Sequence, residues 1–181
     1  MNTKDMMNVE KLKNAVRNVP DFPIPGIQFK DVTTLFIQPE ILNELSRGLF
    51  EMYKDKGVTK VVGIESRGFI MGPMLARDLE AGFVPIRKPG KLPAETYEIS
   101  YAKEYGADAI QIHRDALDEN DVVVLHDDLL ATGGTMLAAV ELIRKFNPKK
   151  IYVNFLIELN DLNGRELFDS DIEVASIIQY D

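Results

Sequence analysis

The fold of this 181-residue chain is decided by one stretch, Val122-Val-Val-Leu-His126-Asp127-Asp128-Leu-Leu-Ala131-Thr132-Gly133-Gly134-Thr135. It begins with aliphatic, mostly β-branched residues, which are typical of a buried parallel strand. Two adjacent carboxylates and a glycine-rich turn follow. Beyond the turn, apolar residues from Met136 to Ile143 repeat with the i, i+3, i+4, i+7 spacing of one helix face. The stretch therefore predicts a strand, an acidic tip, a tight loop and the start of a helix.

The loop after this strand has the composition of a phosphate site. The N-terminus of a helix offers free backbone N–H groups and partial positive charge. Gly133 and Gly134 let the backbone approach an anion closely, and the threonines on either side add hydroxyl donors. Ionised Asp127 and Asp128 can only accept hydrogen bonds, which suits the hydroxyls of a ribose 5-phosphate, with Mg2+ as the other natural partner. An ordinary turn with solvated aspartates is the alternative.

Composition narrows the class of protein. Hydrophobic residues make up 45% of the chain, which argues against disorder, and the length favours one domain over residues 1–181. A net charge of −8 argues against a nucleic-acid surface or an anionic membrane surface as partner. The chain has no cysteine and no apolar run of membrane-spanning length. We therefore expect a cytoplasmic globular protein that binds neither nucleic acid nor membrane.

Two further turns carry cations that could bind phosphate. Arg67 follows the apolar strand from residue 60 to 64, and open α/β sheets bind their ligands at such strand ends. The spacing from Gly63 to Gly68 imitates a Walker A loop, but that loop's Lys and Ser/Thr are missing. A second turn, residues 87–91, holds three cations. A guanidinium suits a diphosphate, whereas a surface ion pair and a solvated basic turn are the simpler alternatives.

The remaining segments predict a frame around these turns. Three prolines and a glycine between residues 20 and 26 predict an extended loop without regular structure. Phe29 near its end could either pin that loop to the core or stack on a ligand. Alternating residues on both sides of Gly106 predict a β-hairpin over about 94–116. Apolar runs predict a helix over 40–55 and strands over 150–159 and 174–180.

Four separated motifs resemble the type I phosphoribosyltransferase family, and within it the members that act on adenine. They are Asp127-Asp-Leu-Leu-Ala-Thr-Gly-Gly-Thr135, Glu65-Ser-Arg-Gly-Phe69, Arg87-Lys-Pro-Gly-Lys-Leu-Pro93 and Ser100-Tyr-Ala-Lys-Glu-Tyr-Gly106. The resemblance spans about residues 20–168. It implies an α/β fold, a parallel sheet flanked by helices over about 37–159. A small hood is expected from the N-terminal loop and the C-terminal strand, about 1–36 and 160–181. It also implies a cis peptide bond between Glu65 and Ser66.

The resemblance further implies transfer of the 5-phosphoribosyl group from phosphoribosyl pyrophosphate (PRPP) to adenine, which yields AMP and pyrophosphate. Mg2+ would be held mainly by PRPP, and a homodimer is expected. The implied residues are Glu104 and Tyr105 for catalysis; Ala131, Thr132, Gly133, Gly134 and Thr135 for the 5-phosphate; Asp127 and Asp128 for the ribose; Arg67, Arg87, Lys91 and Ser66 for pyrophosphate; and Phe29, Gln28 and Leu159 for adenine.

Two positions depart from the family pattern. Lys30 stands where the family more often has Arg, and His126 where it usually has an apolar residue. For His126 we expect a half-buried packing role.

Two other functions are the alternatives. One is the same chemistry on a 6-oxopurine. The other is a non-catalytic PRPP sensor that controls transcription, which would need a basic DNA-binding segment that this acidic chain lacks.

Overall fold

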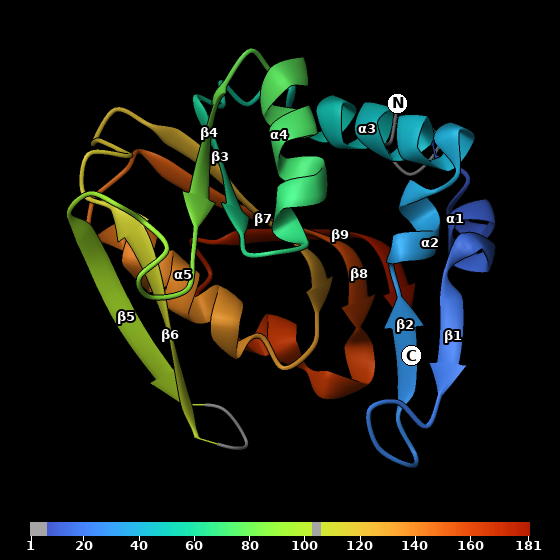
Figure 1. Cartoon of the computed structure of the whole chain (residues 1–181). Coiled ribbons are helices and arrows are strands. Elements are labelled where there is room, and N and C mark those ends of the chain that lie inside the picture. The colour runs from blue at the N-terminus through green and yellow to red at the C-terminus, as the bar shows by residue number, and fades with distance from the viewer. Residues whose placement is uncertain (1–6, 103–105) are drawn as a thin grey trace. The chain divides into compact units, whose positions relative to one another are not determined.

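The computed structural model describes residues 7–102 and 106–181, which form two compact units, the first ending at Met52 and the second running from Tyr53 to Asp181 (Figure 1). In the first unit, α1 (Val9–Ala15) precedes a hairpin of β1 (Arg17–Pro20) and β2 (Gln28–Asp31), followed by α2 (Thr33–Phe36) and α3 (Pro39–Tyr53). The predicted helix over 40–55 is thus confirmed.

The proline-rich segment forms an irregular turn over residues 21–27, as its sequence predicts, and short strands flank it on both sides. Strands β1 and β2 pair antiparallel, from Arg17 opposite Asp31 to Pro20 opposite Gln28. The prolines do not interrupt the pairing, because Pro20 lies at the end of β1 and the others lie in the connecting turn. Within this turn the peptide bond between Phe22 and Pro23 is cis.

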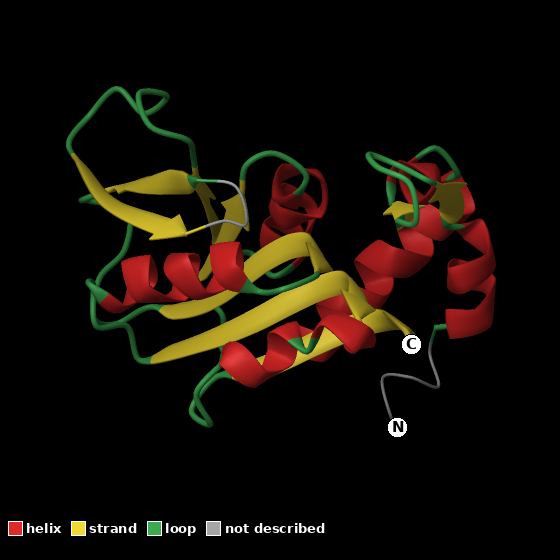
Figure 2. Cartoon of the chain, turned by 90° about the horizontal axis from the view of Figure 1, so that it is seen from below, coloured by secondary structure: helices red, strands yellow, loops and turns green. Residues whose placement is uncertain are grey.

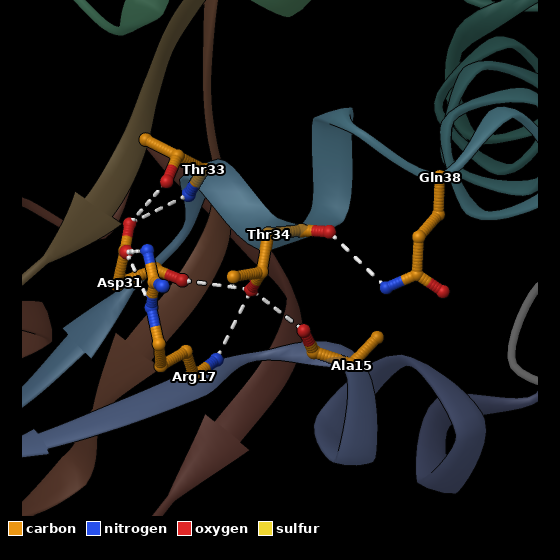
Figure 3. A network of polar contacts seen from close by, with 6 residues as sticks. All are labelled: Ala15, Arg17, Asp31, Thr33, Thr34 and Gln38. Atoms are coloured by element: carbon orange, nitrogen blue, oxygen red, sulfur yellow. Dashed lines mark hydrogen bonds and ion pairs between the residues drawn. The ribbon is translucent and has the colours of Figure 1, made fainter.

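A polar network fastens this hairpin to α2 (Figure 3). The Asp31 carboxylate accepts hydrogen bonds from the Thr33 backbone N–H and hydroxyl and from the Arg17 guanidinium. The bonds from Thr33 and then Arg17 lower the pKa of Asp31 to about 2. The Thr34 hydroxyl donates to the carbonyl oxygen of Ala15 at 2.6 Å. One carboxylate and one hydroxyl therefore connect four consecutive elements, from α1 to α2.

The second unit is built on a five-stranded parallel sheet in the order β4-β3-β7-β8-β9. The strands are β3 (Lys60–Ile64), β4 (Gly82–Ile86), β7 (Val122–Leu130), β8 (Lys150–Leu159) and β9 (Glu173–Tyr180). The helices α4 (Gly68–Asp78) and α5 (Gly134–Arg144) follow β3 and β7, and the one-turn helices η2 (Asn160–Leu162) and η3 (Gly164–Leu167) follow β8. Figure 2 shows α5 lying along the sheet.

A separate hairpin of β5 (Thr96–Ala102) and β6 (Ala107–His113) confirms the predicted β-hairpin. Its buried Ile110 and Ile112 belong to the same apolar core as the inner face of α5 and one face of the sheet. Among the described residues, no helix is long and apolar enough to cross a membrane.

The C-terminal strand differs from its predicted place in a hood. Strand β9 pairs in parallel with β8, from Glu173 beside Tyr152 to Tyr180 beside Leu159, and is thus the fifth strand of the sheet. The physical reason is that Ile177 and Ile178 are both buried, so that the strand covers apolar surface beside β8. All five strands run in the same direction, so their carboxyl ends meet at one edge.

Candidate active site

A pocket of about 350 Å³ lies at the carboxyl edge of the sheet. The ends of β3 and β7, the loop between β7 and α5, and the β5–β6 hairpin form its walls. It is lined by Ile64, Glu65, Lys88, Tyr101, Ile110, Asp127, Leu129, Leu130, Ala131, Thr132, Gly133, Gly134, Thr135, Met136 and Phe155. All five residues predicted to bind the 5-phosphate are therefore on its wall.

The loop from Ala131 to Thr135, here called the phosphate loop, contains two glycines, and the backbone conformation requires glycine only at position 133. Gly133 precedes α5 with a φ of +83°, a conformation that L side chains rarely adopt. A Cβ on Gly134 would meet no atom within 4 Å, so the space beside it is open. The loop thus presents the start of an 11-residue helix, with its free backbone N–H groups, to the pocket.

The two aspartates of β7 have different surroundings. Asp127 lines the pocket, whereas Asp128 is 3% exposed and forms an ion pair with Arg67, whose Nε lies 2.9 Å from Asp128 Oδ2. Burial raises the pKa of Asp127, and the adjacent Asp128 charge raises it further. Burial also raises the pKa of Asp128, although Arg67 opposes the shift. Of the two predicted ribose acceptors, Asp127 therefore lies on the pocket wall and Asp128 pairs with Arg67.

Two of the three cations predicted to bind pyrophosphate, Arg87 and Lys91, lie beside Glu65, which the sequence prediction did not include. Lys91 Nζ lies 2.5 Å from Glu65 Oε1, and Arg87 Nε lies 3.4 Å from Oε2, which also accepts the Lys88 backbone N–H at 2.9 Å. Burial alone would raise the pKa of Glu65, but these hydrogen bonds and charges lower it to about 2. The sequence did contain a signal for this role: Glu65 directly follows the strand over residues 60–64, and the basic turn over residues 87–91 follows the neighbouring strand.

The turn after Glu65 has the geometry that the resemblance implied. The peptide bond between Glu65 and Ser66 is cis, and Ser66 is exposed. Gly68 then lies so close to β7 that a Cβ on it would be 2.7 Å from the carbonyl oxygen of His126. Glycine at this position allows the start of α4 to pack against the strand that carries the aspartates.

A chain of polar contacts joins the hairpin to the phosphate loop. The Thr135 hydroxyl donates to the Tyr101 hydroxyl at 3.1 Å, and the latter lies 3.4 Å from Asp108 Oδ2. Asp108 also forms an ion pair with Lys88. Sequence reasoning did not assign Tyr101 or Asp108 to the site, because neither lies in a turn with a recognisable anion-binding pattern.

The adenine candidates come from both units. Gln28 is exposed and Phe29 half-buried in the first unit, where the Phe29 ring meets that of Phe22 edge to face at 5.1 Å. Leu159 ends β8 in the second unit and is half-buried. Glu104 and Tyr105 lie outside the described residues.

The two departures from the family pattern have defined contacts. Lys30 Nζ donates to Asn18 Oδ1 at 3.1 Å across the first hairpin. His126 is fully buried, more deeply than expected, and its Nδ1 lies 2.8 Å from Asn154 Oδ1. Burial lowers the pKa of His126 to about 4, although the contact with Asn154 opposes the shift. His126 is therefore a neutral residue of the core at neutral pH.

Comparison with known proteins agrees with this geometry. Residues 31–178 match the model of the phosphoribosyl transferase domain. The adenine phosphoribosyltransferase of Bacteroides thetaiotaomicron is 69% identical over 173 residues, which cover 96% of this chain and 98% of the relative. The chain belongs to the phosphoribosyltransferase family, among its adenine phosphoribosyltransferases.

Solved structures of this family have the same fold. The crystal structure of adenine phosphoribosyltransferase from Rhodothermus marinus matches with a TM-score of 0.88 and 49% identity, covering 95% of this chain and 98% of the other. The Saccharomyces cerevisiae enzyme, complexed with an imino-altritol bisphosphate and adenine, matches with a TM-score of 0.88 and 37% identity, covering 94% and 98%. The predicted α/β fold, a parallel sheet flanked by helices, is thereby confirmed.

Proposed function

We propose that this phosphoribosyltransferase transfers the 5-phosphoribosyl group of PRPP to adenine and releases AMP and pyrophosphate. The observation that carries the proposal is the pocket wall, on which the phosphate loop and Glu65, the centre of the Arg87 and Lys91 cluster, both lie. PRPP has a monophosphate at one end and a diphosphate at the other, so it requires two anion sites of this kind. The yeast relative was solved with adenine, which supports the choice of base.

In this proposal the monophosphate occupies the phosphate loop, where backbone N–H groups and the hydroxyls of Thr132 and Thr135 donate to it. Hydrogen bonds to charged groups contribute about 1.5–3 kcal/mol each, so three or four of them suffice to hold a monophosphate. Asp127 and Asp128 accept the ribose hydroxyls, Asp127 from the pocket wall and Asp128 while it orients Arg67.

The chemical step breaks the bond between the ribosyl carbon and the pyrophosphate oxygen and forms a bond to the base nitrogen. Negative charge grows on the departing pyrophosphate, and Arg67, Arg87 and Lys91 stabilise it, with Ser66 as a further donor. The Asp128 and Glu65 carboxylates hold these cations in place beforehand, which reduces the reorganisation needed during the reaction. No covalent nucleophile is required.

For the adenine-binding part of the site, the proposal follows the resemblance to the family. Gln28, Phe29 and Leu159 would contact adenine. Glu104 would exchange a proton with the base, and Tyr105 would help to exclude water, because a hydrolysed PRPP is lost to the reaction.

Mg2+ completes the proposal. Within residues 7–102 and 106–181, no three His, Cys, Asp or Glu side chains gather in a way that could hold a metal ion. These residues therefore do not form a protein cage, and we propose that Mg2+ binds mainly through the oxygens of PRPP. When bound there, Mg2+ neutralises part of the charge on the diphosphate. The resemblance also supports a cytoplasmic homodimer, which light scattering after size exclusion would test.

The deciding experiment incubates the protein with PRPP, Mg2+ and each purine base separately and follows nucleotide formation. AMP from adenine, with no IMP or GMP from the other bases, is the expected result. Nucleotide from hypoxanthine or guanine would overturn the choice of base and leave the chemistry standing. Binding of PRPP without any product would favour a PRPP sensor and refute the enzymatic proposal.

A further inference from the structure

The turn after β8, residues 163–167, packs directly against the phosphate loop (Figure 1). A Cβ built on Gly164 would lie 2.2 Å from the carbonyl oxygen of Ala131 and 3.1 Å from the backbone nitrogen of Gly133. In the other direction, a Cβ on Gly133 would lie 2.7 Å from the carbonyl oxygen of Gly164. The two backbones are therefore in contact at both glycines, and neither position has room for a side chain.

One arginine fastens this turn to the sheet. The Arg165 guanidinium donates to both oxygens of Glu158, at 2.8 and 2.5 Å, and to the carbonyl oxygen of Val174 at 2.6 Å. Ser176 on β9 also donates to Glu158, and Gln179 donates to it at 3.3 Å. A bidentate pair of this kind is directional as well as strong, so it fixes the position of the turn.

Glu158 and Arg165 are both charged at neutral pH. Glu158 is only 4% exposed, and burial alone would raise its pKa, but the Arg165 and Ser176 hydrogen bonds leave the pKa lowered. The hydrogen bond to Glu158 likewise raises the pKa of Arg165. Removing Arg165 would leave the buried Glu158 carboxylate without its bidentate partner, whereas the Arg165 side chain is 41% exposed.

Glu158 also lies beside the place where the phosphate loop begins. In the sheet it is the register partner of Leu130, the last residue of β7 before the loop. The same carboxylate is therefore connected to the loop along two routes: through the β7–β8 pairing, and through Arg165 and the Gly164 contact. The loop is supported from behind while its other side faces the pocket.

We propose that Gly164, Arg165 and Glu158 are positioning residues for phosphate binding: the turn acts as a template that holds the phosphate loop in its anion-binding conformation, and the ion pair holds the turn. The inference rests on the proposed function, since it takes the loop to bind the 5-phosphate of PRPP and AMP. None of the three residues touches the phosphate; each acts through the backbone of the loop.

The test measures the reverse reaction, in which AMP carries the 5-phosphate and pyrophosphate binds among the separate cations. We expect Gly164→Ala and Arg165→Met to raise KM for AMP roughly tenfold or more, the effect of losing one hydrogen bond to a charged phosphate. KM for pyrophosphate should stay within about twofold. The matched controls are Gly82→Ala, where the new Cβ meets only the flexible Lys60 side chain, and Arg144→Met, which removes an arginine that binds three carboxylates outside the pocket.

Each outcome decides one way. A rise in KM for AMP alone supports a positioning role, whereas equal changes for both substrates, or none, overturn it. If Arg165→Met does not fold, Glu158→Gln, which keeps size and shape, is expected to give the same selective rise. If the unmodified protein shows no turnover, the proposed function fails. Calorimetry with ribose 5-phosphate then still tests the turn: equal binding by the unmodified protein and the Gly164→Ala variant, including binding by neither, would overturn the inference.

Discussion

Lowering the pH from 7.5 to 5 is expected to destabilise the folded protein by about 2 kcal/mol through His126 alone. The side chain is fully buried in β7, and burial lowers its pKa from 6.5 to about 4 despite the contact with Asn154. In the unfolded chain the His126 imidazole takes up a proton near pH 6.5, whereas in the folded protein it takes one up only near pH 4. Between these values the unfolded state binds more protons, so stability falls as the pH falls.

The magnitude follows from the two pKa values. The difference between 6.5 and about 4 corresponds to about 3 kcal/mol in full, since each pH unit is worth about 1.4 kcal/mol. At pH 5 about 2 kcal/mol of this is already lost, and above about pH 6.5 the contribution is constant. The effect is a substantial part of the roughly 5–15 kcal/mol that stabilises most domains.

Urea unfolding followed by circular dichroism at both pH values would measure the effect, with His126→Leu as the comparison. Other groups, such as Asp127 and Asp128, titrate in both proteins, so the difference between their pH dependences isolates His126. The variant is expected to be less stable at pH 7.5, because Asn154 Oδ1 loses its contact with His126, but to lose about 2 kcal/mol less on acidification. Identical pH dependences in the two proteins would refute the assignment of a buried neutral histidine.

Three further outcomes test the proposed site. Asp128→Asn is expected to weaken PRPP binding about tenfold or more, because a carboxylate that holds Arg67 becomes a neutral amide; unchanged affinity by calorimetry would remove Asp128 from the ribose and pyrophosphate side of the site. Lys91→Met is expected to raise KM for pyrophosphate about tenfold, since one charge-assisted contact is lost. Lys149→Met serves as the matched control, because Lys149 lies neither on the pocket wall nor beside Glu65. Glu104→Ala is expected to lower kcat more than PRPP affinity, and a kcat equal to that of the unmodified protein would exclude Glu104 from proton transfer.

Much of the fold was predictable because the relevant signals are local. The apolar run of β7, the helical spacing of α5 and the alternation around Gly106 are properties of residues close together in the chain, and each predicted its element. The positive φ that favours glycine at position 133 is local too, whereas the Gly164 carbonyl oxygen that also excludes a side chain there belongs to a distant part of the chain.

The place of β9 was not predictable in the same way. Its apolar residues predict a strand, but whether that strand joins the sheet or a hood depends on which neighbouring surface it buries. In the first hairpin the prolines correctly predicted the irregular turn, but the antiparallel pairing of the residues on either side of it depends on contacts such as that between Arg17 and Asp31.

The sequence by itself determined the strand–loop–helix unit and the family, and it predicted three turns as candidate anion sites, because each of these depends on residues that are neighbours along the chain. Only the tertiary structure decided the partners: Asp128 with Arg67, Glu65 with Lys91, and Gly164 against the phosphate loop. Those contacts depend on the strand order β4-β3-β7-β8-β9, in which strands distant in sequence lie side by side. The order is set by how the apolar faces are buried together, and no single turn contains that information.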